Sequence, residues 1–77
     1  MLLQNIIKNL PTHLKLIKIK ELALDSRKVK IGDLFFAFKG ETFNGENYIK
    51  EAINNGAKAI ICSTECKIRS KNIPIIK

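Results

Sequence analysis

Three adjacent polar residues follow a short apolar stretch in the first half of the chain. Asp25, Ser26 and Arg27 supply a carboxylate, a hydroxyl and a guanidinium directly after Leu24. At the end of a strand, Ser and Asp side chains commonly bond to nearby backbone amides and stabilise a turn. A hydroxyl, a cation and backbone amides can also bind a small anion. The triplet therefore fits either an ordinary turn or one wall of a binding site.

A second candidate loop, from Gly40 to Gly45, has the G-x4-G spacing of a phosphate-binding loop. In nucleoside triphosphatases the next two residues are Lys and Ser or Thr, which reach the phosphates and Mg²⁺. Glu46 and Asn47 occupy these positions here, and an acidic residue at the lysine position would repel a triphosphate. We predict no nucleotide hydrolysis at this loop. Its Thr42 and Phe43 are binding candidates, because an aromatic ring can cover a planar ligand.

Catalysis by side chains and metal binding have little support in the sequence. The single histidine, His13, is far along the chain from Ser26. Cys62 and Cys66 are three residues apart, whereas a typical metal or redox pair is separated by two. We therefore predict no catalytic residue and no metal site. Cys62 is interpreted as a small apolar residue that ends a buried strand.

Short apolar segments are predicted to form the strands that position the two loops. These segments are 21–24, 34–38, 57–62 and 73–76. The continuous apolar run 34–38 is typical of a strand covered on both faces. Ile49, Ala52 and Ile53 have helical spacing between two of the strands, and Gly56 is well placed as the left-handed residue after the helix. A strand–helix–strand unit of this kind forms a right-handed parallel pair.

The amino-terminal segment is predicted to begin with a short helix. Its apolar residues recur at helical spacing, at Leu2, Leu3, Ile6, Ile7 and Leu10. Pro11 would end this helix, and residues 12–20 are interpreted as a connector with some extended character. These elements predict a small α/β domain of three-layer type, with a short mixed or parallel sheet and two helices. Because the chain closes on the apolar run 73–76, we expect it to be incomplete at its carboxyl end.

Composition excludes several classes of protein. A chain of 77 residues forms one domain at most, and its 45% apolar content argues against disorder. No apolar run reaches the ~18 residues of a membrane span, and a basic leader with a cleavage site is missing. We therefore expect a cytoplasmic protein without membrane contact.

The net charge of +7 is compatible with binding to nucleic acid. The lysines are scattered, however, and no aromatic RNA-binding pattern, glycine clamp or zinc-finger spacing accompanies them. We therefore predict no nucleic-acid partner, and a small phosphorylated ligand accounts for the same charge with fewer residues. If the strands before the two loops are neighbours, the loops meet at the sheet edge where α/β proteins usually bind ligands. The residues alone fit a small nucleotide-like anion and two ordinary turns equally well, and a small basic nucleic-acid-binding module is the alternative of another class.

The stretch 24–61 closely resembles the amino-terminal domain of the Mur ligases. The resemblance rests on the combination of Asp-Ser-Arg, Gly-Asp-Leu-Phe, the glycine loop and the helix that ends in Gly-Ala. Two turn positions depart from the usual form. Ile31 stands where proline commonly precedes the glycine, and Asn44 stands where aspartate commonly precedes Gly45. These departures concern the rigidity of the loops rather than the identity of the ligand.

In that family this domain holds the UDP end of the substrate, and the remaining domains carry the chemistry. The positions that match the family's nucleotide-binding residues are Leu24, Ser26, Glu41, Thr42 and Phe43. We add Arg27 as a candidate partner of the pyrophosphate, with a salt bridge to Asp25 or Asp33 as the equally good alternative. The resemblance thus implies that 1–77 is a UDP-binding domain whose partner is UDP-N-acetylmuramoyl-dipeptide.

The family member that fits best adds meso-diaminopimelate or L-lysine to UDP-N-acetylmuramoyl-L-alanyl-D-glutamate during peptidoglycan precursor synthesis. The enzyme that adds D-Ala-D-Ala is the alternative, although Ser26 and the segment 48–49 favour the first. In such enzymes a central domain binds ATP and Mg²⁺ and phosphorylates the glutamate carboxylate, and a third domain positions the incoming amine. Neither domain is present in this chain. We therefore expect it to hold no cofactor and to have no ligase activity alone.

Overall fold

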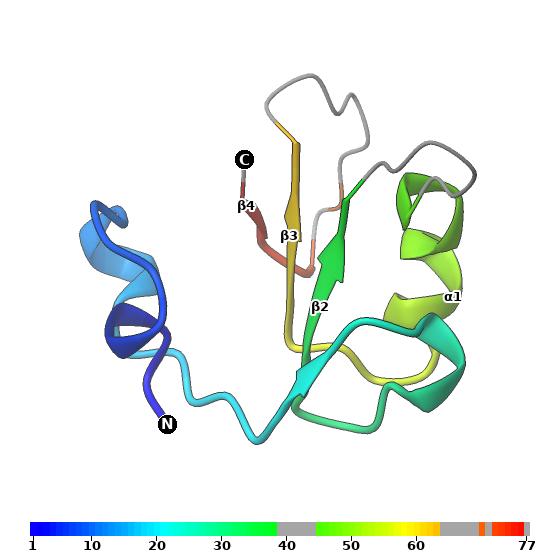
Figure 1. The fold of residues 1–77 in the computed structure, drawn as a ribbon. Coiled ribbons are helices and arrows are strands. Elements are labelled where there is room, and N and C mark those ends of the chain that lie inside the picture. The colour runs from blue at the N-terminus through cyan, green and yellow to red at the C-terminus, as the bar shows by residue number, and fades with distance from the viewer. Residues whose placement is uncertain (39–44, 64–69, 71, 77) are drawn as a thin grey trace.

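A sheet of four parallel strands forms the centre of the fold (Figure 1). The structure is a computed structural model, and it describes residues 1–38, 45–63, 70 and 72–76. The strands are β1 (Leu22–Ala23), β2 (Leu34–Ala37), β3 (Ala59–Cys62) and β4 (Ile75–Ile76), and they lie side by side in the order of the chain. The prediction of a small α/β domain is confirmed, and the sheet is parallel throughout.

Strand β2 shows why its apolar run is continuous. Phe35 and Ala37 are fully buried in the cluster on the α1 side of the sheet, whereas Leu34 and Phe36 pack into the cluster on the opposite face. Successive side chains of a strand point to opposite faces, so a strand that is covered on both sides needs apolar residues at every position. The predicted two-sided burial is confirmed for Leu34–Ala37, whereas Phe38, the last residue of the predicted run, lies past the strand and is 49% exposed.

One face of the sheet is covered by the helix α1 (Ile49–Asn54), which follows the 3-10 turn η4 (Gly45–Tyr48). Ile49 and Ala52 are buried and pack against the sheet, as their spacing predicts. Gly56 lies just past the helix with φ of +109°, a conformation that side chains rarely adopt. The predicted helix and its terminating glycine are both confirmed.

The amino-terminal segment does not form the predicted helix. It contains two 3-10 turns, η1 (Leu3–Asn5) and η2 (Thr12–Leu14), and Asn9 adopts a left-handed φ of +61°. The backbone N–H of Leu3 donates to the carbonyl of Ile17 at 2.8 Å, so the segment folds back on itself. A helix of about ten residues is marginal on its own. Backbone hydrogen bonds between the two halves of the segment therefore replace the regular i to i−4 hydrogen bonds of a helix.

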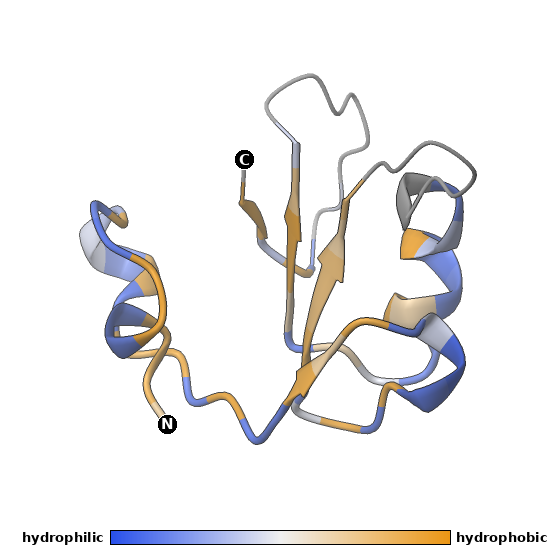
Figure 2. Ribbon diagram, in the orientation of Figure 1, coloured by the Kyte–Doolittle hydropathy of each residue, from blue (hydrophilic) through white to orange (hydrophobic). Residues whose placement is uncertain are grey.

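The apolar spacing of this segment nevertheless has the expected packing role. Leu3, Leu10 and Ile19 are buried in one cluster with Leu34 and Ala59 of the sheet. Figures 1 and 2 show this segment on the opposite side of the sheet from α1, with the apolar strands between the two layers. The three-layer arrangement is confirmed, with an irregular outer layer and a single α-helix in the described part of the chain.

Cys62 is buried at the end of β3, as predicted, while Cys66 lies outside the described residues. No helix within the described ranges is both long and apolar enough to cross a membrane.

Candidate functional site

The triplet 25–27 forms the turn that directly follows β1. Ser26–Lys28 is a 3-10 turn, η3, and Asp25 is its N-cap. The Asp25 Oδ1 accepts the backbone N–H of Arg27 at 2.9 Å, which is the side-chain-to-backbone bond expected of a carboxylate at this position. The turn chemistry predicted from the sequence is confirmed.

The Arg27 side chain forms a bidentate ion pair with Asp25. Its Nη2 lies 2.8 Å from Oδ2 and its Nε lies 3.1 Å from Oδ1. The side-chain and backbone hydrogen bonds from Arg27 lower the pKa of Asp25 from 3.8 to about 2, and the same pair raises the pKa of Arg27. The salt bridge weighed as an alternative role for Arg27 is therefore formed, with Asp25 rather than Asp33. A contact with pyrophosphate stays a prediction.

Ser26 is bonded through its side chain to α1 and through its backbone to Asn55, the C-cap of α1. The residue is only 4% exposed, and its Oγ donates to Glu51 Oε1 at 2.5 Å. Its carbonyl oxygen accepts from Asn55 Nδ2 at 2.9 Å. Glu51 and Asn55 are four residues apart and so lie on the same side of the helix. Sequence reasoning missed both residues, because only their helical spacing could have indicated a shared target.

A pocket of about 460 Å³ opens beside this turn, and its walls are Leu24, Asp25, Ser26, Arg27 and Tyr48. The structure therefore brings Leu24, Ser26 and Arg27 together, three of the predicted binding residues. Leu24 is 74% exposed although it is apolar. Tyr48 comes from η4, at the start of α1, and was not predicted as a site residue. Its aromatic ring just before the Ile49 helix is the only signal that could have found it.

The remaining predicted site residues Glu41, Thr42 and Phe43 lie outside the described residues, as does the predicted loop around them. The strands that precede the two predicted loops, β1 and β2, lie within the described residues. Because β1 and β2 are adjacent and parallel, with Leu22 opposite Leu34 and Ala23 opposite Phe35, both strands end at the same edge of the sheet. This adjacency is the condition set above for the two loops to share a site.

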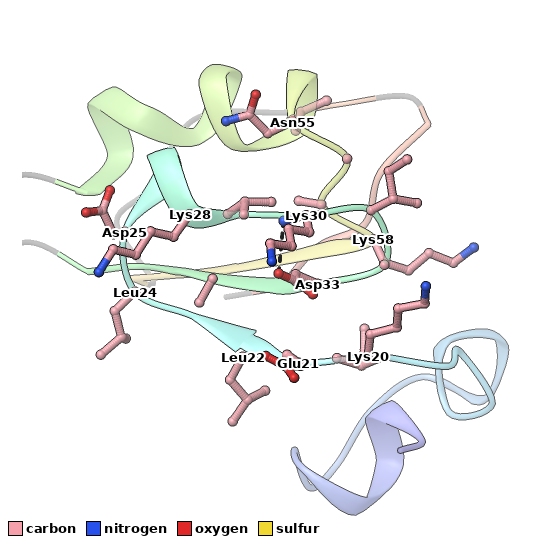
Figure 3. Close-up of a pocket in the computed structure, with 18 of the residues that line it drawn as sticks. Lys20, Glu21, Leu22, Leu24, Asp25, Lys28, Lys30, Asp33, Asn55 and Lys58 are labelled. Carbon is pink, nitrogen blue, oxygen red and sulfur yellow. Dashed lines mark hydrogen bonds between the residues drawn. The ribbon is translucent and has the colours of Figure 1, made fainter.

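A larger groove of about 1960 Å³ runs along β1 and shares Leu24, Asp25 and Arg27 with the pocket (Figure 3). The lysines in its lining are Lys18, Lys20, Lys28, Lys30 and Lys58. Asp33, also in the lining, is buried and accepts the backbone N–H of Lys30 at 2.9 Å. A groove lined by several cations favours an anionic ligand.

Among the described residues, no group of three or more His, Cys, Asp and Glu residues is placed to hold a metal ion. Gly45–Tyr48 forms a 3-10 turn in which Glu46 and Asn47 replace the Lys and Ser or Thr of a triphosphate-binding loop.

Comparison with known proteins identifies the family. Residues 18–77 match the model described as "Mur ligase family, catalytic domain". The chain is 39% identical over 75 residues to the UDP-N-acetylmuramoyl-L-alanyl-D-glutamate–2,6-diaminopimelate ligase of Haemophilus influenzae strain 86-028NP, which covers 90% of this chain and 15% of that protein. It is 44% identical over 59 residues to the ligase of the same name from Aquifex aeolicus, across 77% of this chain and 12% of that protein.

Solved structures of Mur ligases are also similar to this chain. The MurF ligase of Thermotoga maritima, determined in complex with ADP, superimposes with a TM-score of 0.63 and 36% identity, covering 79% of this chain and 14% of that one. A MurF structure from Acinetobacter baumannii gives a TM-score of 0.64 and 28% identity, over 90% of this chain and 14% of that one. The chain thus spans a small part of the proteins that it matches. Because the family model covers most of the chain, the protein belongs to the Mur ligase family.

Proposed function

We propose that this chain holds the UDP end of UDP-N-acetylmuramoyl-L-alanyl-D-glutamate for a ligase of peptidoglycan precursor synthesis. The observation that carries the proposal is the pocket after β1, where Leu24, Ser26 and Arg27 meet Tyr48. Leu24 and Ser26 are the positions at which the family resemblance implies contact with the uridine nucleotide. The names of the curated relatives, which are ligases of this UDP-sugar dipeptide, support the same substrate.

The chemistry of the pocket suits a nucleotide. The Ser26 hydroxyl donates a hydrogen bond to Glu51, so its oxygen lone pairs remain available to accept a hydrogen bond from a ligand N–H or hydroxyl. The exposed Leu24 offers apolar contact to a base. The lysines of the adjoining groove, together with Arg27, give a positive potential for the diphosphate.

The catalytic steps belong to other parts of the proposed enzyme. ATP and Mg²⁺ would bind outside these 77 residues, in the central domain expected of the family, and the amine would be positioned by a third domain. The chain alone is therefore proposed to be inactive as a ligase. An assay with this chain, ATP, Mg²⁺, UDP-N-acetylmuramoyl-dipeptide and diaminopimelate should give no tripeptide product, and formation of product would contradict the proposal.

A second candidate is the corresponding domain of the ligase that adds D-Ala-D-Ala. The observation in its favour is the similarity to MurF structures and to the UDP-N-acetylmuramoylalanyl-D-glutamyl-2,6-diaminopimelate–D-alanyl-D-alanyl ligase of Acinetobacter baumannii. Both candidates share the UDP end of the substrate. They are separated by comparing the affinities of UDP-N-acetylmuramoyl-dipeptide and -tripeptide for a longer protein that carries this domain.

The direct test is selectivity among nucleotides. Isothermal titration of the chain with UDP, ADP and a short oligonucleotide at two salt concentrations should show weak, saturable binding of UDP and weaker binding of ADP. Ser26→Ala should reduce the affinity for UDP, whereas Lys8→Ala, in the outer layer, should not. Equal affinity for all three probes with a steep salt dependence would instead indicate a basic nucleic-acid-binding surface.

A further inference from the structure

Strand β1 is an outer strand of the sheet: it pairs with β2 on one side, and no other strand of the described residues pairs with it. The Glu21 carbonyl accepts the backbone N–H of Leu34 at 2.9 Å, and Leu22 lies opposite Leu34. Successive residues of a strand turn their backbone groups to opposite sides. Glu21 and Ala23 therefore bond to β2, whereas the N–H and C=O of Leu22 face away from the sheet. An outer edge of this kind can accept a further strand.

The outer edge of β1 is open along its length. Leu22 is 50% exposed and Leu24 is 74% exposed. Within the described part of the chain, no hydrogen bond joins the N–H or C=O of Leu22 to another residue. The groove of about 1960 Å³ follows this edge, with residues 18–25 along one wall and residues 27–33 along another. An extended chain therefore has room to lie beside β1.

The two faces of an added strand would meet different surroundings. Leu22 and Leu24 are two residues apart and so lie on the same face of β1. Figure 3 shows both leucines pointing away from the labelled lysines, which line the rest of the groove. Because the side chains of a strand alternate, an added strand would present every second residue to the leucines and the residues between them to the lysines.

The charge of the groove determines which partner fits. Its lining contains five lysines and Arg27 against three carboxylates. Asp25 is paired with Arg27, and the buried Asp33 accepts the backbone N–H of Lys30. A second copy of this chain, paired edge to edge, would bring two such groups of lysines together, so like-charge repulsion disfavours it. An acidic strand would complement the same lysines.

We propose that β1 is a docking edge for an extended segment of a partner protein in which acidic and apolar residues alternate. Backbone bonds to Leu22 would supply affinity, and the leucines and lysines would select the side chains of the segment. Lys20 and Lys58 precede β1 and β3, so they lie at the end of the sheet away from the nucleotide pocket. The docking edge meets that pocket at Leu24 and does not depend on the proposed function.

The probe is a short synthetic peptide in which glutamate and valine alternate, titrated into the full chain at moderate salt. When the peptide binds, the Leu22 N–H should change from fast to slow hydrogen exchange because it gains an acceptor. The Ala23 N–H already bonds to β2 and should change little. Two further peptides, N-methylated at the glutamates only or at the valines only, block opposite edges of the peptide strand. One of these peptides should lose binding, and the other should keep it.

Variants of the chain test the same contacts from the other side. Leu22→Pro removes the outward N–H and leaves the bonds to β2, an arrangement that outer strands tolerate. It should weaken peptide binding about fivefold or more, the equivalent of one hydrogen bond of about 1 kcal/mol. Leu22→Ala keeps the N–H and should bind the peptide more tightly than Leu22→Pro does.

Charge reversal has its own matched control. Lys58→Glu and Lys8→Glu lower the net charge by the same amount, but only Lys58 lines the groove, so only Lys58→Glu should weaken peptide binding. Circular dichroism melting of each variant verifies folding, and the N-methylated peptides test the edge without any change to the chain.

Three results would overturn the proposal. If both N-methylated peptides bind like the parent peptide and the Leu22 N–H stays in fast exchange, the attraction is one of charge alone and no strand is added. If the alternating peptide does not bind, the lysines serve only to keep an outer strand from pairing with other chains. If sedimentation shows a dimer that Leu22→Pro dissociates, the edge joins two copies of this chain instead.

Discussion

The Ser26 hydroxyl donates a hydrogen bond to the Glu51 carboxylate, which joins the turn after β1 to a helix 25 residues further along the chain. Asn55, one turn beyond Glu51, donates to the carbonyl of the same serine. Strand β1 contributes only two residues to the sheet, so it offers little to fix the turn by itself. The position of Ser26 at the pocket therefore depends on α1.

Removing the helix side of this contact should weaken both folding and binding. We expect Glu51→Ala to reduce the free energy of unfolding by about 1 kcal/mol, the usual net value of one hydrogen bond, and to lower the affinity for UDP. Glu51→Gln keeps an acceptor oxygen and should recover most of both. Lys50→Ala, on the same helix, is the matched control. Urea denaturation of these variants, with Ser26→Ala and the double variant, gives the coupling energy, and additive effects would contradict the contact.

The ion pair between Arg27 and Asp25 predicts a titration that can be measured residue by residue. Asp25 should titrate with a pKa of about 2 in the folded chain, below its ordinary 3.8. Because the folded-state pKa is lowered, the stabilising contribution of the pair is complete above pH 3.8 and is lost as the pH falls toward 2. The Arg27 side chain is exposed to solvent and Asp25 is only partly buried, so the contribution is small.

Arg27→Gln should return the pKa of Asp25 toward 3.8, as followed by the carboxyl carbon resonance during an acid titration. Lys28→Gln leaves the hydrogen bonds from Arg27 in place and should produce a much smaller change. If the Asp25 resonance titrates near 3.8 in the original chain, the pair does not form in solution.

Gly56 and Gly32 are a matched pair for testing backbone geometry. Both have positive φ, +109° and +94°. A Cβ on Gly56 would lie 2.7 Å from the Ile31 Cα, which is backbone, whereas a Cβ on Gly32 would meet only the flexible Lys20 side chain, at 3.1 Å. We expect Gly56→Ala to destabilise the chain by more than about 1 kcal/mol and by more than Gly32→Ala does. Thermal denaturation checks the order, and an equal loss in both variants would contradict the close approach at Gly56.

The amino-terminal layer is predicted to be necessary for stability although it is irregular. Leu3 is fully buried between this layer and the sheet. Leu3→Ala should cost about 2 to 5 kcal/mol, which is most of the stability that a chain of this size usually has. Leu16→Ala removes the same side chain from an exposed position of the same layer and should be nearly neutral. Similar effects of the two substitutions would show that the layer does not pack as described.

The sequence predicted those parts of the fold in which one pattern dominates. The continuous apolar run predicted a strand buried on both faces, which holds for Leu34–Ala37 and fails at the exposed Phe38. The pattern of Ile49, Ala52 and Gly56 predicted both the helix and its end. The helix predicted for the amino-terminal segment was wrong, because the spacing of apolar residues alone does not distinguish a helix from two 3-10 turns. The deciding bond, from Leu3 to the carbonyl of Ile17, connects residues that are far apart in the chain.

The candidate site was predictable where local chemistry or family resemblance named it, at Leu24, Ser26 and the Asp25–Arg27 pair. Glu51, Asn55 and Tyr48 reach the turn through the tertiary fold, and neither the helical spacing of the first two nor the aromatic ring of Tyr48 was enough to assign them to it. The predictions for Glu41, Thr42 and Phe43 stay predictions, because these residues lie outside the described ranges.

The most direct measurement of the central claim is a map of backbone amide shifts as UDP is added to the isotopically labelled chain. We expect saturable shifts to concentrate at Leu24, Ser26, Arg27 and Tyr48, which line the pocket after β1. They should persist at moderate salt and be lost in Ser26→Ala. Small, salt-sensitive shifts spread over the lysines, with none at Leu24 and Ser26, would contradict a uridine-nucleotide site at this edge of the sheet.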